Sequence, residues 1–174
     1  RRPLILAGGG ARWAGPALRA LAERLDAPVV QTVNARGLMW GHPLSVPASP
    51  SLEAVRDLIR QSDQILAIGS ELGRTDYDMY VNGLLPDLSG MIRADVCAEQ
   101  LARHPARLRL MADAGQVLAG LLPLVTPRQG DGGARVCVFG AERGQFGNVA
   151  PFALLGEGPG HGATDAHDAA GVDD

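Results

Sequence analysis

The sequence has no lysine, only two cysteines, and aromatic residues at just 4% of its 174 positions. Cys97 and Cys137 lie far apart and lack the short spacing of a metal site, so the sequence predicts neither a disulfide scaffold nor a zinc module. We interpret both as buried or inert thiols. No apolar run approaches the roughly 20 residues that span a bilayer, and no signal peptide is visible. We therefore expect a cytoplasmic protein without a membrane segment.

Basic charge is also scarce. All 16 basic residues are arginine, and 19 acidic residues bring the formal net charge to −3. Because no basic face is interleaved with aromatic side chains, the sequence argues against a nucleic-acid partner. A hydrophobic content of 46% with 20% charged residues is typical of a globular domain.

Short apolar runs alternate with helical patterns along the first 125 residues. Apolar residues with helical spacing predict helices over residues 15–25, from Ser51 as N-cap onward, over residues 98–103, and after Asp113 as N-cap. Continuous apolar runs predict strands over residues 3–7, 28–32, 64–68, 91–94 and 108–111, and residues 34–50 have the composition of a loop. This alternation predicts an α/β fold whose mostly parallel sheet is covered on both faces, with all strand-to-helix loops at one edge.

The pattern changes after residue 126. Residues 130–133 predict a flexible break, residues 135–139 have the composition of a strand, and the final stretch is acidic and rich in Gly, Ala and Pro. We therefore expect one domain over residues 1–126 and an irregular or disordered tail over residues 127–174. The tail composition is also what shifted GC-rich codons produce, which suggests a frameshift or truncation after about Gly133 as a hypothesis. Because the chain begins without methionine, we expect it to be part of a longer protein.

The strongest functional signal is Gly8, Gly9 and Gly10, which connect the first strand to the first helix. Such a turn can bring backbone N–H groups and the positive end of a helix against a phosphate, or it can simply allow a tight bend. The dinucleotide fingerprint is incomplete, because Trp13 stands where the third glycine belongs and no acidic residue follows the second strand at Thr32. We therefore do not expect an NAD dehydrogenase.

The other polar motifs have simpler interpretations. Asp131 between two glycines suggests a metal or diphosphate ligand, but no companion Asn follows at a suitable distance, so we interpret residues 130–133 as a linker. We interpret His42 as a loop residue, and Tyr77 and Tyr80 as anchors of a polar connection. A loose cluster in the tail lacks supporting residues for metal binding: His161, Asp165, His167 and Asp168. The sequence thus predicts no catalytic residue and no metal ligand.

Seven short segments follow one another in a specific order over residues 1–125. They cover residues 2–11, 27–32, 35–37, 42–45, 63–72, 91–95 and 112–114. Together they resemble the central domain of thiamine-diphosphate-dependent enzymes of the acetolactate synthase-like group. Residues 73–78 are more similar to the related 2-oxo-acid decarboxylases, including those that act on guanidino-bearing oxo acids.

The resemblance implies a three-layer, Rossmann-like (DHS-like) domain with a six-stranded sheet, which binds FAD or ADP in some members and is empty in others. By position, it implies that the diphosphate would contact Gly8, Gly9 and Gly10. Further contacts would follow the second strand, at Thr32, Val33 and Asn34, and the central strand, at Gly69, Ser70 and Arg74. The adenosine would contact Asp95 and Val96, and the adenine would lie near Asp113. The sequence departs from the family at Cys97, where many relatives have Asp, and at Asn34-Ala35.

The resemblance also implies what a larger enzyme would add. In this family the glutamate that activates thiamine lies on an N-terminal domain, and the Mg²⁺ and diphosphate site lies on a C-terminal domain. We therefore expect these two domains as partners, a homo-oligomer, and no catalysis by this chain alone. Two alternatives stay open: a stand-alone module for FAD or an adenine nucleotide, and an empty scaffold whose crevice is filled by Arg12 or Trp13.

Overall fold

The computed structural model describes residues 2–74, 76 and 86–141. The chain divides into two compact units, Arg1–Arg143 and Gly144–Asp174, and the second lies outside the described residues. The part of the predicted tail after residue 141, which includes the histidine cluster, also lies outside the described residues. So do Tyr77 and Tyr80. No helix in the described ranges is long and apolar enough to cross a membrane.

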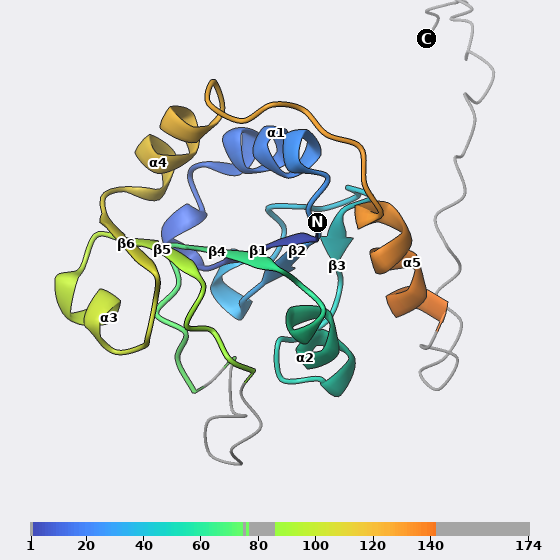
Figure 1. Ribbon diagram of the computed structural model, residues 1–174, viewed down its shortest axis with the longest axis horizontal. Helices are drawn as coiled ribbons and strands as arrows, with labels where there is room; N and C mark the ends of the chain where they lie inside the picture. The colour runs from blue at the N-terminus through green and yellow to red at the C-terminus, as the bar shows by residue number, and fades with distance from the viewer. Residues whose placement is uncertain (1, 75, 77–85, 142–174) are drawn as a thin grey trace, which may run out of the picture. The chain divides into compact units, whose positions relative to one another are not determined.

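Six strands form one sheet in which all neighbouring pairs run parallel (Figure 1). They are β1 (Pro3–Ala7), β2 (Val29–Gln31), β3 (Ser45–Val46), β4 (Gln64–Ile68), β5 (Ile92–Asp95) and β6 (Leu108–Met111). Their order in the sheet is β3-β2-β1-β4-β5-β6, so the direction of the chain across the sheet reverses between β1 and β4. This arrangement confirms the predicted α/β, Rossmann-like fold.

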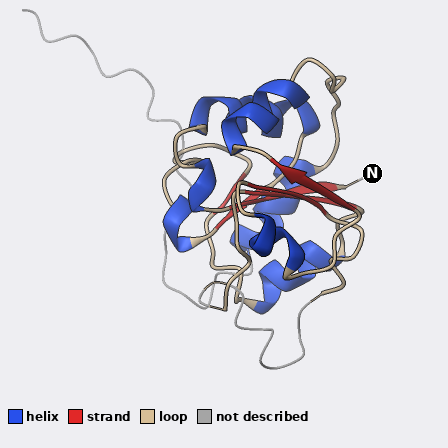
Figure 2. Ribbon diagram, turned by 90° about the vertical axis from the view of Figure 1, so that its left-hand side faces the viewer, coloured by secondary structure: helices blue, strands red, loops and turns tan. Residues whose placement is uncertain are grey.

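Helices cover both faces of the sheet, which gives three layers (Figures 1 and 2). On one face lie α1 (Gly15–Leu25) and α4 (Ala114–Leu121), which contact each other. On the other lie α2 (Glu53–Arg60) and α3 (Ala98–Ala102). Two short 3₁₀ turns, η1 (Gly9–Ala11) and η2 (Val33–Ala35), follow β1 and β2, and α5 (Gly132–Ala141) comes last.

Strand β1 shows why the sheet needs both helical layers. Its residues are all buried, and side chains alternate between the two faces. Ile5 and Ala7 belong to the apolar core under α1 and α4, whereas Leu4 and Leu6 belong to the core under α2. A strand that is apolar at every position is therefore stable only inside a parallel sheet that is covered on both faces.

Two predicted elements differ from the observed ones. The run predicted as a strand over residues 135–139 lies inside helix α5, and the predicted loop over residues 34–50 contains strand β3. A short apolar run does not by itself distinguish helix from strand, and a two-residue edge strand has too little pattern to detect. Both were settled by contacts with distant parts of the chain.

The predicted cap of α2 was also wrong. The helix begins at Glu53, and Leu52 occupies the N-cap position without a side-chain hydrogen bond. The Ser51 hydroxyl instead donates to the carbonyl oxygen of Asp76 at 3.0 Å. By contrast, Asp113 caps α4 as predicted, because its carboxylate accepts hydrogen bonds from the amides of Gly115 and Gln116.

Candidate functional site

The residues proposed to contact a nucleotide lie at the carboxyl edge of the sheet. Because the strands are parallel, the segments that follow β1, β2, β4, β5 and β6 emerge on the same side. The candidates are the last residue of a strand or belong to one of these segments: Gly8, Gly9, Gly10, Thr32, Val33, Asn34, Gly69, Ser70, Arg74, Asp95, Val96 and Asp113. The topology therefore brings them to one edge, although not into one cavity.

At the reversal point between β1 and β4, the two turns touch through their backbones. The amide of Gly8 donates to Ile68 O at 2.9 Å, and the amide of Gly10 donates to Gly69 O at 2.9 Å. A Cβ atom on Gly8 would lie 2.3 Å from Gly69 O, and Gly69 itself has a φ of +57°. Glycine is required at Gly8 because the backbones of the two turns approach each other this closely. Two of the three glycine amides are thus engaged within the protein.

The turn after β4 is held by a buried arginine that sequence reasoning did not single out. Arg93, on β5, is 1% exposed and donates from Nη2 to Ser70 O at 3.0 Å and from Nη1 to Gln100 O at 2.9 Å. The Ser70 hydroxyl accepts from the amide of Leu72 at 3.2 Å, and Leu72 has a positive φ of 51°. A charged residue inside an apolar strand was the available signal, because such a group needs buried partners.

The turn after β2 is fixed in a similar way. Thr32 is buried, and its amide donates to Ala7 O at 3.0 Å. The amide of Val33 donates to a carboxylate oxygen of Asp76 at 2.8 Å. Asn34 is exposed and lies against Gly9, so η1 and η2 contact each other. Asp76 therefore positions this turn, whereas the sequence suggested only a polar connection.

Two carboxylates at the far side of the edge also serve the backbone. Asp95 accepts from the amide of Cys97 at 2.9 Å, and Asp113 accepts from the amide of Gly115 at 2.8 Å. Val96, between β5 and α3, is 69% exposed. Cys97 is a free thiol of intermediate exposure, and the side chain of Cys137 lies outside the described residues. Asp95 and Asp113 therefore support the turns from which they come.

A cavity of about 320 Å³ lies between the start of α1 and the start of α4. It brings together two of the predicted residues, Gly10 and Asp113, with the indole of Trp13. Trp13 is 86% exposed, and the Arg12 guanidinium carbon lies 5.3 Å from the centre of its ring. The N-cap of α1, Ala14, makes no side-chain hydrogen bond, and the start of this helix lines the cavity through Ala14, Pro16 and Ala17.

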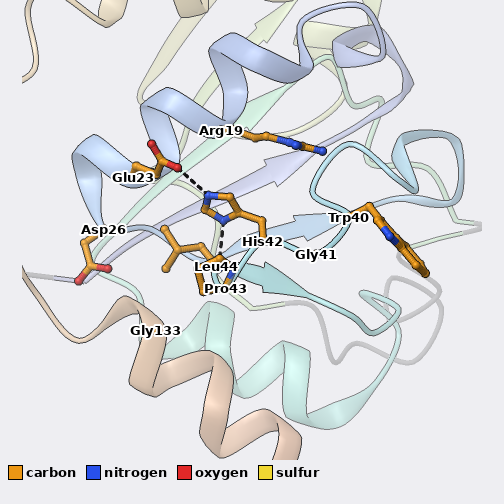
Figure 3. A pocket seen from close by; sticks show the side chains of 9 residues that line it. All are labelled: Arg19, Glu23, Asp26, Trp40, Gly41, His42, Pro43, Leu44 and Gly133. Carbon is orange, nitrogen blue, oxygen red and sulfur yellow. Dashed lines mark hydrogen bonds and ion pairs between the residues drawn. The ribbon is translucent and has the colours of Figure 1, made fainter. Parts of the chain in front are cut away.

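A second cavity, of about 460 Å³, lies near the opposite, amino edge of the sheet (Figure 3). His42 lines it, with its Nε2 atom 3.0 Å from a carboxylate oxygen of Glu23 and its Nδ1 atom accepting from the amide of Leu44 at 3.2 Å. Because both ring nitrogens have partners, His42 stabilises the loop before β3 and is not placed as a free base. Within residues 2–74, 76 and 86–141, no three His, Cys, Asp or Glu side chains group so that they could hold a metal ion.

Comparison with known proteins identifies the family. The family model described as "Thiamine pyrophosphate enzyme, central domain" matches residues 1–121. The chain is 38% identical over 124 residues to a protein of Pseudomonas aeruginosa named "Probable 2-ketoarginine decarboxylase AruI", a match that covers 70% of this chain and 22% of that protein.

Two further relatives agree. A sulfoacetaldehyde acetyltransferase of Rhodobacter capsulatus is 32% identical over 140 residues, covering 75% of this chain and 23% of the relative. The large subunit of acetolactate synthase isozyme 1 of Escherichia coli is 27% identical over 135 residues, covering 72% and 23%. The chain thus spans about a fifth of the length of these relatives. The ordered segments, the parallel sheet and the family match agree, and the chain belongs to the central-domain family of thiamine pyrophosphate enzymes.

Proposed function

We propose that this chain is the central domain of a larger thiamine-diphosphate-dependent 2-oxo-acid decarboxylase or carboligase, in which it acts as a rigid scaffold and carries no catalytic group of its own. The family match and the relatives named above support the enzyme class. The larger protein would supply the N-terminal and C-terminal domains as partners, and we propose that it is a homo-oligomer. The similarity to a 2-ketoarginine decarboxylase favours a 2-oxo acid with a guanidino side chain as its substrate.

The internal use of the polar groups at the carboxyl edge is the observation that carries the scaffold role. The amides of Gly8 and Gly10 donate to the end of β4 and to the turn after it, and the carboxylates of Asp95 and Asp113 accept from backbone amides. Because these amides and carboxylates hydrogen-bond within the protein, they hold neighbouring turns in fixed positions. The carboxyl edge of the sheet would therefore give adjoining domains a rigid surface against which to pack.

Thiamine diphosphate supplies the carbanion chemistry in this family when it is bound, and Mg²⁺ accompanies its diphosphate. The described residues do not fit such a site, because no acidic or histidine cluster is placed to hold a metal ion among them. We therefore derive no catalytic step from this chain. Its contribution to the larger enzyme is to hold and orient the domains that bind the cofactor.

A turnover assay tests the scaffold role. The purified chain is given thiamine diphosphate, Mg²⁺ and either pyruvate or 2-ketoarginine, with a complete relative such as the Escherichia coli acetolactate synthase assayed in parallel on pyruvate. We expect no product above the background of free cofactor. Substrate turnover by this chain alone would contradict the proposal.

An adenine nucleotide, as ADP or as part of FAD, is the second candidate ligand, and the cavity at Gly10, Trp13 and Asp113 favours it. An exposed indole offers a face on which a base can stack, and the uncapped start of α1 favours phosphate. The remaining predicted contacts, at Thr32, Asn34, Gly69, Arg74 and Val96 among others, stay predictions.

Calorimetry with ADP and FAD tests this second function, and the chain offers a matched control. Trp13 and Trp40 are 86% and 84% exposed, but only Trp13 lines the cavity beside Gly10 and Asp113. If the cavity binds the base, Trp13→Ala should weaken binding by about 5- to 100-fold, which corresponds to about 1–3 kcal/mol for one stacked base. Trp40→Ala should leave it unchanged. No heat at millimolar nucleotide, or equal losses for both variants, would exclude this site.

A further inference from the structure

The segment between α4 and α5 crosses the amino edge of the sheet, opposite the candidate nucleotide edge. In Figure 1 it leaves α4, passes over α1 and ends in α5, which lies beside β3 and α2. The last part of this connection and α5 itself, residues 126–141, lie beyond the residues that match the family. We call residues 126–141 the clamp segment. The sequence suggested a flexible linker at its centre, but its contacts differ from those of a linker.

The first attachment is Asp26, the residue that ends α1. Its φ is 48°, in the left-handed region, and one oxygen of its carboxylate accepts from the amides of Gly130 at 2.8 Å and Gly132 at 3.0 Å. Two residues before Gly130, the amide of Arg128 donates to the carbonyl oxygen of Arg24 at 3.0 Å. The Gly-Asp-Gly motif, for which the sequence offered a metal ligand or a linker, is therefore a docking turn.

The glycines of this turn are not interchangeable. A Cβ atom on Gly132 would lie 2.2 Å from the backbone oxygen of Asp26, which is far inside van der Waals contact. A Cβ atom on the next residue, Gly133, would have no atom within 4 Å. Both glycines lie in the first turn of α5, so the effect of alanine on helix propensity differs little between the two positions. Only the contact with α1 distinguishes them.

The second attachment is the guanidinium of Arg135. This residue is 9% exposed, and it donates from Nη1 to Pro3 O at 2.9 Å and from Nη2 to the Ser62 hydroxyl at 2.5 Å. Ser62 in turn donates to Leu58 O at the end of α2. Burial lowers the pKa of Arg135, while the nearby carboxylate of Asp131 opposes this shift. One side chain thus joins α5, β1 and α2.

The energetics of this guanidinium favour a structural role. A buried charge is stable only when it keeps its partners, and loss of one partner destabilises strongly. The Arg2–Asp131 ion pair, at 3.1 Å, is about half exposed on both sides and contributes little by comparison. The attachment therefore depends on Asp26, Gly132 and Arg135.

We propose that residues 126–141 are an integral clamp of this domain, which locks α1, β1 and α2 together at the amino edge and extends the domain past the boundary expected at residue 126. In a larger enzyme, which rests on the proposed function above, α5 would be part of the rigid central domain and not of a flexible linker.

The glycine pair gives the sharpest test in the full chain. We expect Gly132→Ala to lower the midpoint of thermal unfolding by about 5–10 °C and Gly133→Ala to leave it within about 2 °C or raise it. Limited proteolysis followed by mass spectrometry should show cleavage within residues 126–141 at least about tenfold faster in Gly132→Ala than in Gly133→Ala. Equal midpoints and equal cleavage rates would overturn the clamp.

Two further measurements keep the proposal testable if Gly132→Ala fails to fold. Arg135→Met preserves much of the side-chain volume and should accelerate cleavage in the same segment, whereas Gln129→Ala, an exposed residue of that segment, should not. In the unaltered chain, the amides of Gly130 and Gly132 should exchange with solvent at least about 100-fold more slowly than in an unstructured peptide. Unprotected amides would overturn the clamp and would leave the scaffold proposal, which is tested by turnover, untouched.

Discussion

Replacement of Gly8 by alanine tests whether the crossing of the turns after β1 and β4 is fixed by backbone contact. The new Cβ atom would lie 2.3 Å from Gly69 O and 2.5 Å from the Cα atom of Ser70. Neither atom belongs to a flexible side-chain end that could move aside. The turn after β1 must therefore shift, and the hydrogen bonds from the amides of Gly8 and Gly10 are lost or distorted.

The expected loss follows from these two effects. Each backbone hydrogen bond contributes about 1 kcal/mol net. The repacking of an overfilled site adds about 1–3 kcal/mol. Together they lower the free energy of unfolding by about 3–5 kcal/mol, a large share of the roughly 5–15 kcal/mol that stabilises a typical domain.

Urea denaturation followed by far-ultraviolet circular dichroism is the suitable assay. Tryptophan fluorescence is less informative, because Trp13 and Trp40 are already exposed in the folded protein. With a slope of about 2 kcal/mol per molar urea, the midpoint should fall by about 2 M. Gly90→Ala is the matched control, since a Cβ atom at this turn glycine would have no atom within 4 Å.

A small effect would refute the argument. If Gly8→Ala unfolds within about 0.3 M urea of the unaltered chain, the two turns do not rely on this contact. Equal losses for Gly8→Ala and Gly90→Ala would also refute it, because the cause would then be glycine replacement in general.

Two further predictions concern single side chains. Asp113→Ala should lower the free energy of unfolding in urea by about 1 kcal/mol because it removes the N-cap of α4, whereas Asp113→Asn should retain most of the stability. An unchanged free energy of unfolding in Asp113→Ala would contradict the capping role. The pKa of His104 is lowered from 6.5, chiefly by burial and also by the charges of Arg93 and Arg103. The unfolded chain therefore takes up this proton first as the pH falls below about 6.5, so stability should decrease from pH 7 to pH 5, and His104→Gln should show a smaller decrease; identical pH profiles would contradict this assignment.

The sequence alone predicted most of the central architecture. An all-apolar run such as residues 3–7 belongs inside a covered parallel sheet, and helical spacing over residues 15–25 places α1. These patterns are local, since each depends on a few neighbouring residues. The ordered segments also identified the family, and the glycine turn was correctly expected between β1 and the first helix.

The candidate site was only partly predictable. Parallel topology placed the chosen residues at one edge, but the sequence did not show that the amides of Gly8 and Gly10 donate to the end of β4 and the turn after it. It also missed Arg93, whose partners come from two other segments. Whether a glycine amide points to a ligand or to a neighbouring turn depends on the close approach of strands that are distant in the chain.

The last part of the chain shows the same division. Composition identified a glycine-rich break and a short apolar run at the right places, and local propensity predicted a linker followed by a strand. Tertiary structure determined instead that Gly132 docks on Asp26, 106 positions away in the sequence, and that Arg135 reaches Pro3 across 132 positions. Local patterns predict elements because backbone preference and periodic burial act over a few residues, whereas contacts across more than a hundred positions form only when the folded sheet brings their partners together.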